Sequence, residues 1–181
     1  AMVGTKSSGT NPSQPGTPST DILNETFAES IGSFTIANEK DLPQGLKAVW
    51  FVDKKYHQVK ASAFFQNKKY ETESWLISPA LDLSGKTTVT LTVEQAANFF
   101  KSMKDEIFIK ISTNYKSGKP STATWEVLTP SKWPLNKDWT SVNSTVDLSA
   151  YAGKKDVRIA FQYKSTTQSA GTWELKNLVV K

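Results

Sequence analysis

Cysteine is absent from the sequence, and histidine and arginine each occur once, as His57 and Arg158. Without cysteine the chain cannot form a disulfide framework or a thiolate metal site. With one histidine it cannot build a zinc site from imidazoles, and any mechanism that needs two histidines is excluded. The fold must therefore be held by its apolar core, alone or with the help of a hard cation.

Acidic charge is in the minority, because 22 basic residues face 17 acidic ones and give a net charge of +5. Nearly all the basic residues are lysines, whereas nucleic-acid-binding proteins usually depend on arginine for bidentate contacts. We therefore expect no nucleic-acid partner. Lysine pairs at residues 54–55, 68–69 and 154–155 lie beside turn-like segments. They are either solvated loop charges or a source of attraction to an acidic glycan or surface.

Long hydrophobic runs and catalytic signatures are missing as well. No stretch approaches the roughly 18 apolar residues of a membrane-spanning helix, so we expect no span in this chain. No Gly-x-Ser-x-Gly elbow, phosphate-binding loop or metal-binding histidine pair occurs. Carboxylates are frequent on predicted strands and turns, and none of them singles out a glycosidase pair. We expect a binding protein and no enzyme.

Residues 1–20 contain almost nothing to bury, because proline, glycine, serine and threonine dominate them. This composition is typical of an extended linker that tethers a module of a larger extracellular protein. We expect residues 1–3 to be a cloning remnant ahead of a trimmed native start, with the linker continuing to residue 20.

From residue 22 onward, short runs with alternating apolar residues follow one another. Residues 87–94 are the clearest, since Val89, Leu91 and Val93 share one face and threonines occupy the other. Residues 107–113 repeat this period, and glycine- and proline-containing turns separate the runs. The best helical stretch, residues 94–104, is short. The pattern predicts an all-β domain over residues 21–181, a β-sandwich of two antiparallel sheets.

Several segments together resemble the choice-of-anchor J and cleaved-adhesin families of jelly-roll domains from Bacteroidetes. The most specific one is Trp-Leu-Ile-Ser-Pro-Ala-Leu-Asp-Leu at residues 75–83, followed by the Thr/Val strand that ends at Glu94. Supporting matches are Asn-Glu-Thr-Phe at 24–27, Leu-Pro-Gln-Gly at 42–45, Val-Asp-Leu-Ser-Ala-Tyr at 146–151 and Trp-Glu-Leu-Lys-Asn-Leu at 173–178. The resemblance covers essentially all of residues 22–180.

The resemblance implies a jelly-roll sandwich, similar to MAM and galactose-binding-like domains, in a secreted or outer-membrane surface-exposed protein. Such domains are non-catalytic modules, so we expect a monomer within a larger multi-domain protein. Related domains often hold a structural Ca²⁺ between the first and last strands, and Glu25 matches the acidic position of the first strand. Asn177 stands where the family often has an acidic residue, so affinity should fall. Otherwise Glu25 is simply a solvated edge residue.

Aromatic side chains are the candidates for ligand binding. Trp75, Trp125 and Trp173 lie within strand patterns and are expected in the core. Trp133 lies in a proline-flanked loop, where it is either exposed or folded back as a lid on the core. We predict a ring-lined binding site from residues of several loops: Trp133, Trp50, Tyr56, His57, Tyr70, Phe99 and Phe100.

Two functions follow from these features. The first is a carbohydrate-binding module that binds a polysaccharide through exposed rings, with the linker adding reach and avidity. The second is an adhesin or architectural domain that attaches to a host or partner protein through an exposed apolar patch. A ring-lined groove would favour the first, and an apolar patch would favour the second.

Overall fold

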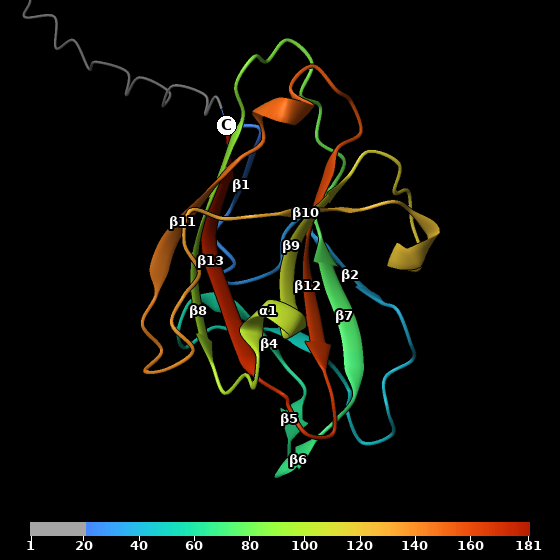
Figure 1. Ribbon diagram of the computed structural model, residues 1–181, viewed down its shortest axis with the longest axis vertical. Helices are drawn as coiled ribbons and strands as arrows, with labels where there is room; N and C mark the ends of the chain where they lie inside the picture. Colours follow the sequence, from blue (N-terminus) through green and yellow to red (C-terminus); the bar gives the residue numbers. More distant parts are fainter. Residues whose placement is uncertain (1–20) are drawn as a thin grey trace, which may run out of the picture.

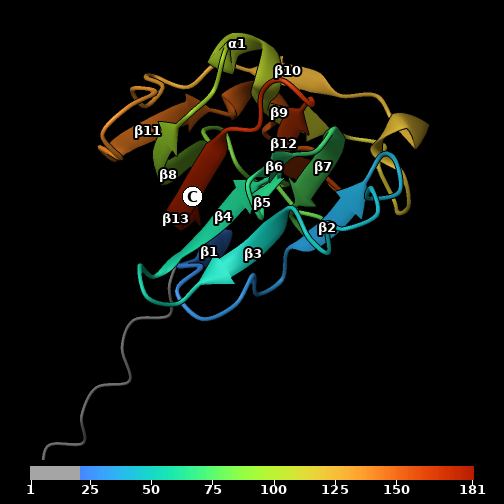
Figure 2. The same cartoon turned by 90° about the horizontal axis from the view of Figure 1, so that it is seen from below.

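Two antiparallel β-sheets stack face to face in the computed structural model, which describes residues 21–181 (Figure 1). The two layers are seen edge on in Figure 2. The all-β class and the predicted jelly-roll sandwich are confirmed. The predicted linker, residues 1–20, lies outside the described residues. Among the residues that the structure describes, no helix is long and apolar enough to cross a membrane.

One sheet, called the front sheet here, carries the candidate site. In spatial order it contains β11 (Val142–Asp147), β8 (Thr90–Asn98), β13 (Thr172–Val180), β4 (Gln58–Ser62) and β3 (Trp50–Asp53). Strand β1 (Leu23–Glu25) pairs with the far end of β13, beyond the part of β13 that pairs with β4. A β-bulge in β13 lies between these two parts, where Asn177 has φ 52°.

The other sheet, called the back sheet, contains β10 (Glu126–Leu128), β9 (Ile107–Ser112), β12 (Arg158–Ser165), β7 (Thr72–Ile77) and β2 (Thr35–Asn38). A small hairpin of β5 (Phe64–Phe65) and β6 (Lys68–Lys69) extends from the end of the sandwich opposite the C-terminus (Figure 1). Short helical turns are α1 (Met103–Glu106), η1 (Pro120–Thr122) and η2 (Ser149–Tyr151).

The core fills the space between the sheets because alternate residues of each strand point inward. Val89, Leu91 and Val93 are buried, as predicted from the alternation. Trp173 lies at the centre of the core, fully buried, with its ring centroid 5.8 Å from that of Trp50 and 5.6 Å from that of Phe161. Such large rings supply much of the buried area that holds a domain without disulfides.

The outer face of the back sheet is covered by the loop between β9 and β10. A second apolar cluster there contains Trp75 and Tyr115, and Trp125 from the loop packs on both, with centroid distances of 4.9 and 5.4 Å. The indole N–H of Trp125 donates a hydrogen bond of 2.9 Å to the Pro120 carbonyl, which fixes the loop on the sheet. Trp75 is buried and Trp125 is partly buried, but both pack in this cluster on the outer face and not in the core between the sheets, where they were expected.

Candidate functional site

The outer face of the front sheet is hollowed by a cavity of about 500 Å³. Side chains on β4, β8 and β13 that alternate with the core residues form its floor. Antiparallel register places Lys60 opposite Glu174 and Lys176 opposite Glu94. Opposite charges therefore face each other across neighbouring strands, which is the arrangement that stabilises a sheet through cross-strand pairs.

Glu174 is the most deeply placed charge on this floor, with only 8% of its surface exposed. Its carboxylate accepts a hydrogen bond from the Gln58 amide and lies 3.3 Å from the Lys60 ammonium. The same ammonium lies 3.2 Å from the carboxylate of Asp53 on the edge strand. A charge this deep costs free energy unless it is paired and hydrogen-bonded, and these partners meet that requirement.

Glu94 forms a second polar centre beside the first. One carboxylate oxygen accepts a hydrogen bond of 3.1 Å from the Ser141 hydroxyl, and the other accepts one of 3.1 Å from the Asn177 amide. The Lys176 ammonium lies 3.7 Å away. The bulge in β13 thus turns Asn177 toward the outer face. Together, Gln58, Lys60, Glu94, Glu174 and Lys176 make a floor rich in hydrogen-bond donors and acceptors.

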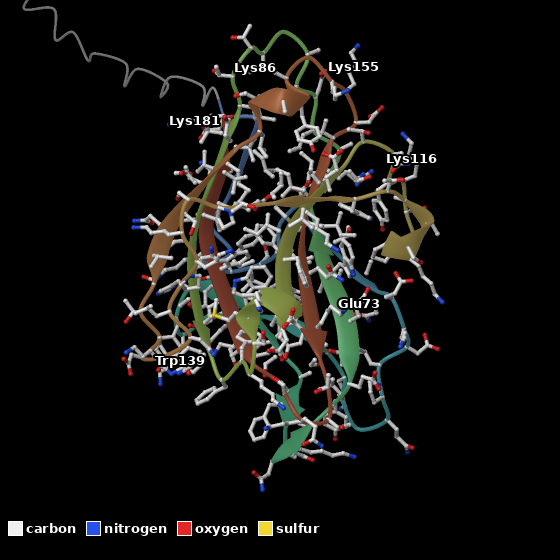
Figure 3. All side chains as sticks on the ribbon, in the orientation of Figure 1. Glu73, Lys86, Lys116, Trp139, Lys155 and Lys181 are labelled. Atoms are coloured by element: carbon white, nitrogen blue, oxygen red, sulfur yellow. The ribbon has the colours of Figure 1, made fainter. Side chains whose placement is uncertain are left out.

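Aromatic rings border this polar floor. Tyr56 lines the cavity from the turn between β3 and β4, and Trp139 lines it from the loop before β11. Trp139 is 42% exposed, and the Lys60 ammonium lies 5.7 Å from its ring centroid. Figure 3 places Trp139 on the front-sheet side of the molecule, away from Glu73 on the back sheet. Ring faces beside hydrogen-bonding groups are what a sugar-binding site requires.

The hollow continues past Trp139 into a more apolar part. A neighbouring cavity of about 840 Å³ shares Trp139 with the first and is lined by Phe64 and Phe99. Phe99 is 67% exposed. A third cavity, of about 470 Å³, shares Phe64 with the second and Lys60 with the first, and Phe51 lines it. We call these three hollows the ring groove, with a polar half (Gln58, Lys60, Glu94, Glu174, Lys176) and an apolar half (Phe51, Phe64, Phe99, Trp139).

The loops that present the rings have unusual backbone geometry. Phe99 and Trp139 have φ angles of 67° and 54°, and His57, next to Tyr56, has φ 54°. A left-handed conformation is costly for bulky side chains and persists only where surrounding contacts enforce it. Of nine non-glycine residues with positive φ among residues 21–181, six lie in these loops and the β5–β6 turn: His57, Gln66, Asn67, Phe99, Asp138 and Trp139. Such clustering is typical of functional surfaces.

Asn136 connects two of these loops. Its side-chain oxygen accepts a hydrogen bond of 2.9 Å from the backbone N–H of Phe100, and its amide donates to the Phe100 carbonyl at 2.5 Å. These two bonds link the loop that carries Trp139 to the end of β8, which carries Phe99. The positions of the two rings are therefore set by one polar side chain between them.

Three of the predicted ring residues, Tyr56, Phe99 and Phe100, line the groove, although Phe100 is only 5% exposed. His57 is exposed on the same turn as Tyr56. Trp133 takes its alternative position as a lid: it is half-buried, and its ring centroid lies 6.2 Å from that of Trp173. Rings that sequence reasoning missed as site members are Trp139, Phe51 and Phe64.

Two other predicted ring residues, Trp50 and Tyr70, require correction, because they are buried and line none of the three hollows. Trp50 is only 2% exposed, and its indole N–H donates a 3.2 Å hydrogen bond to the Ser74 carbonyl. Tyr70 packs in the same core. Phe100 turns inward onto Tyr163, with centroids 6.0 Å apart. On β3, the outward position belongs to the next residue, Phe51, rather than to Trp50.

The predicted calcium ligands hydrogen-bond to different partners. Glu25 accepts bonds of 3.0 and 2.8 Å from the backbone N–H and the hydroxyl of Ser33, whereas the Asn177 amide binds Glu94. Ca²⁺ requires six to eight oxygen ligands. Within residues 21–181, no group of three His, Cys, Asp or Glu residues could hold a metal ion. A calcium site therefore stays a prediction, in which Glu25 would supply the only charged ligand.

Comparison with solved structures finds domains with a similar fold. A cleaved adhesin domain of Lys-gingipain from Porphyromonas gingivalis is 21% identical, with a TM-score of 0.57, over 89% of this chain and 99% of that domain. A second cleaved adhesin domain of the same protein is 20% identical, with a TM-score of 0.54, over 88% of this chain and 96% of that domain. These matches agree with the cleaved-adhesin resemblance of the sequence.

A carbohydrate-binding module, TmCBM61, solved in complex with β-1,4-galactotriose, matches over 90% of this chain and 99% of its own. Its identity is 8% and its TM-score is 0.50. At these identities the likenesses establish a shared β-sandwich fold. A scan of protein-family models finds no match, and neither does a search of curated proteins.

Proposed function

We propose that this chain is a non-catalytic glycan-binding module that holds a polysaccharide in the ring groove of the front sheet. The observation that carries the proposal is the juxtaposition of exposed rings with a floor of paired polar side chains. Trp139 and Tyr56 offer ring faces for the apolar sides of sugars, and Gln58, Glu94 and Glu174 offer hydrogen bonds to their hydroxyls. The module bound to β-1,4-galactotriose supports this function, because it has the same fold.

A non-catalytic role fits the state of the two carboxylates in the groove. Glycoside hydrolysis needs one carboxyl group that is kept as a proton donor and a second that acts as nucleophile or base. Glu94 and Glu174 each pair with a lysine and accept an amide hydrogen bond from Asn177 and Gln58, respectively. These contacts suit a binding floor better than an acid–base pair.

The adhesin role is the second candidate, and one observation favours it. Phe51, Phe64 and Phe65 are all exposed at the hairpin end of the groove, where phenylalanine supplies no polar atom for a sugar hydroxyl. Such a patch suits the apolar surface of a partner protein. The cleaved adhesin neighbours support this role and a secreted or surface-exposed location. The choice-of-anchor J assignment stays a proposal that rests on the sequence resemblance.

Affinity gel electrophoresis with a panel of plant and host polysaccharides tests the first role. We expect retardation of the protein by at least one polysaccharide, and loss of this retardation in Trp139→Ala. Retardation by none of them would overturn glycan binding and leave the adhesin role. Leu135→Ala is the matched control, because Leu135 is an exposed apolar residue of the same loop that lines none of the three hollows.

A further inference from the structure

We propose that the polar half of the ring groove selects an uncharged stretch of polysaccharide and discriminates against uronate and sulfate groups, although the protein as a whole is basic. This inference rests on the glycan-binding role proposed above. It goes further by naming the class of glycan, and the observation behind it is the pairing of every charge in the polar half of the groove.

The two lysines of the polar half already have carboxylate partners. The Lys60 ammonium lies 3.2 Å from Asp53 and 3.3 Å from Glu174, and the Lys176 ammonium lies 3.7 Å from Glu94. Their side chains are 19% and 32% exposed. The positive charges of Lys60 and Lys176 therefore balance the negative charges of Glu94 and Glu174, and the polar half has no net charge. An anionic sugar would find no uncompensated cation there.

The carboxylates add a repulsive element. A uronate or sulfate group in the polar half would lie near Glu94 and Glu174 in a partly desolvated hollow, where bringing like charges together weakens binding. A neutral sugar does not meet this cost, because its hydroxyls can donate to the carboxylates and accept from the Gln58 amide. Specificity by rejection of the wrong ligand is a common device in binding sites.

Outside the polar half, other lysines attract anions. Lys54 and Lys116 make exposed ion pairs of 3.8 and 3.9 Å, in which each lysine side chain is at least 70% exposed. Within the groove, Lys69 and Lys101 line the second hollow and Lys47 lines the third, and neither hollow has a carboxylate among its lining residues. Lys69 donates a hydrogen bond to the Gln168 carbonyl. Attraction to exposed charges of this kind is screened by salt. Binding of acidic chains should therefore depend on ionic strength, and binding of neutral chains should not.

The experiment compares neutral oligosaccharides with acidic counterparts of the same linkage, such as galactan with polygalacturonate fragments and xylan with glucuronoxylan fragments. Isothermal titration calorimetry is run at low salt and at about 1 M NaCl, where the Debye length is about 3 Å. At high salt we expect the best neutral ligand to bind at least about tenfold more tightly than its acidic counterpart. We also expect Trp139→Ala to weaken that binding by a factor of about 5–30.

Glu174→Gln provides the second arm, since it removes one carboxylate from Lys60 while it keeps the shape and a hydrogen-bond acceptor. This variant should raise the affinity for acidic relative to neutral ligands by about threefold or more. Lys116→Met, which breaks an exposed ion pair away from the groove, should leave the ratio unchanged. Thermal unfolding of each variant checks that the fold is intact.

The outcomes separate this inference from the function on which it rests. Trp139-dependent binding of acidic chains at high salt, equal to or tighter than that of neutral chains, would overturn the selection and leave glycan binding in place. A Glu174→Gln variant with an unchanged ratio would also count against it. If no glycan, neutral or acidic, bound to the protein, the proposed function itself would be overturned.

Discussion

Phe99 and Trp139 meet edge to face on the open side of the front sheet, with ring centroids 5.5 Å apart and planes at 76°. The two residues come from different loops, and both have left-handed backbone conformations. Such a pair is worth about 0.5–1.5 kcal/mol beyond the area it buries. Part of the strain in the two loops is therefore offset by the contact itself, and the result is a fixed pair of exposed rings.

The first prediction concerns Trp139. Trp139→Ala should weaken polysaccharide binding by about 1–2 kcal/mol, a factor of about 5–30, because an aromatic platform at the centre of a site contributes most of its affinity. Stability should change little, since the side chain is 42% exposed. Calorimetric titration and thermal unfolding measure the two effects. An unfolding midpoint that falls while affinity holds would place Trp139 among the structural residues.

A second prediction reverses these effects for Trp50. Trp50→Ala removes a buried ring that contacts Trp173 at 5.8 Å, together with the hydrogen bond to Ser74. The expected loss of unfolding free energy is about 3–5 kcal/mol, measured by chemical denaturation. Ligand affinity of the protein that stays folded should be unchanged. A selective loss of affinity with unaltered stability would restore Trp50 as a ligand-binding residue.

Period-two patterning accounts for what could be predicted of the fold. Val89, Leu91 and Val93 are buried because alternation alone assigns one face to the core. Alternation alone does not assign the inward face of a short strand. Trp50 and Phe51 are adjacent, and only the register with β4 decides which ring points outward. The stretch 94–104, the best helical candidate, continues β8 to Asn98 and forms a single turn at α1.

The polar half of the groove could not be predicted, because it depends on pairings between distant strands. Nothing in the sequence indicates that Lys60 lies opposite Glu174, or Lys176 opposite Glu94; these contacts follow from the positions of β4 and β8 on either side of β13. Trp139 offered a weak signal, since it follows Lys137 and Asp138 in a polar loop, where a large ring has few neighbours to cover it.

The third prediction tests the calcium proposal. If Glu25 is a ligand, Ca²⁺ should raise the unfolding midpoint in proportion to ln(1 + [Ca²⁺]/Kd), with Kd in the range of about 10⁻⁴–10⁻³ M that is typical of extracellular modules. Glu25→Gln should remove the Ca²⁺ dependence. Differential scanning calorimetry with Ca²⁺ and with chelator provides the measurement, and identical midpoints in the two conditions would rule the site out.

A fourth prediction concerns alkaline stability. Burial, and then the hydrogen bond that its hydroxyl donates to Glu126, raise the pKa of Tyr151 to about 12. An unfolded tyrosine has a pKa of about 10, so the folded state binds the proton more tightly. This contribution is complete below about pH 10 and is lost as the pH rises toward 12. Denaturant midpoints measured across this range should fall.

Tyr151→Phe is the test of that assignment, because it removes the titrating group while it keeps the ring. The decline of stability between about pH 10 and 12 should become shallower in this variant. It should not vanish, because burial also raises the pKa of Tyr163. An alkaline profile identical to that of the original protein would show that Tyr151 does not contribute.

The last prediction concerns Asn136, a positioning residue whose side chain joins the two ring-bearing loops through the backbone of Phe100. Asn136→Ala removes both hydrogen bonds, and each is worth about 0.5–1.5 kcal/mol. We expect weaker ligand binding with a more unfavourable binding entropy, because the Phe99 and Trp139 rings must then be ordered when the ligand binds. Lys137→Ala, at the neighbouring exposed position, is the control and should bind normally. Calorimetry separates the enthalpy of binding from its entropy. A loss of affinity that is wholly enthalpic would mean that Asn136 contacts the ligand directly instead of holding the loops.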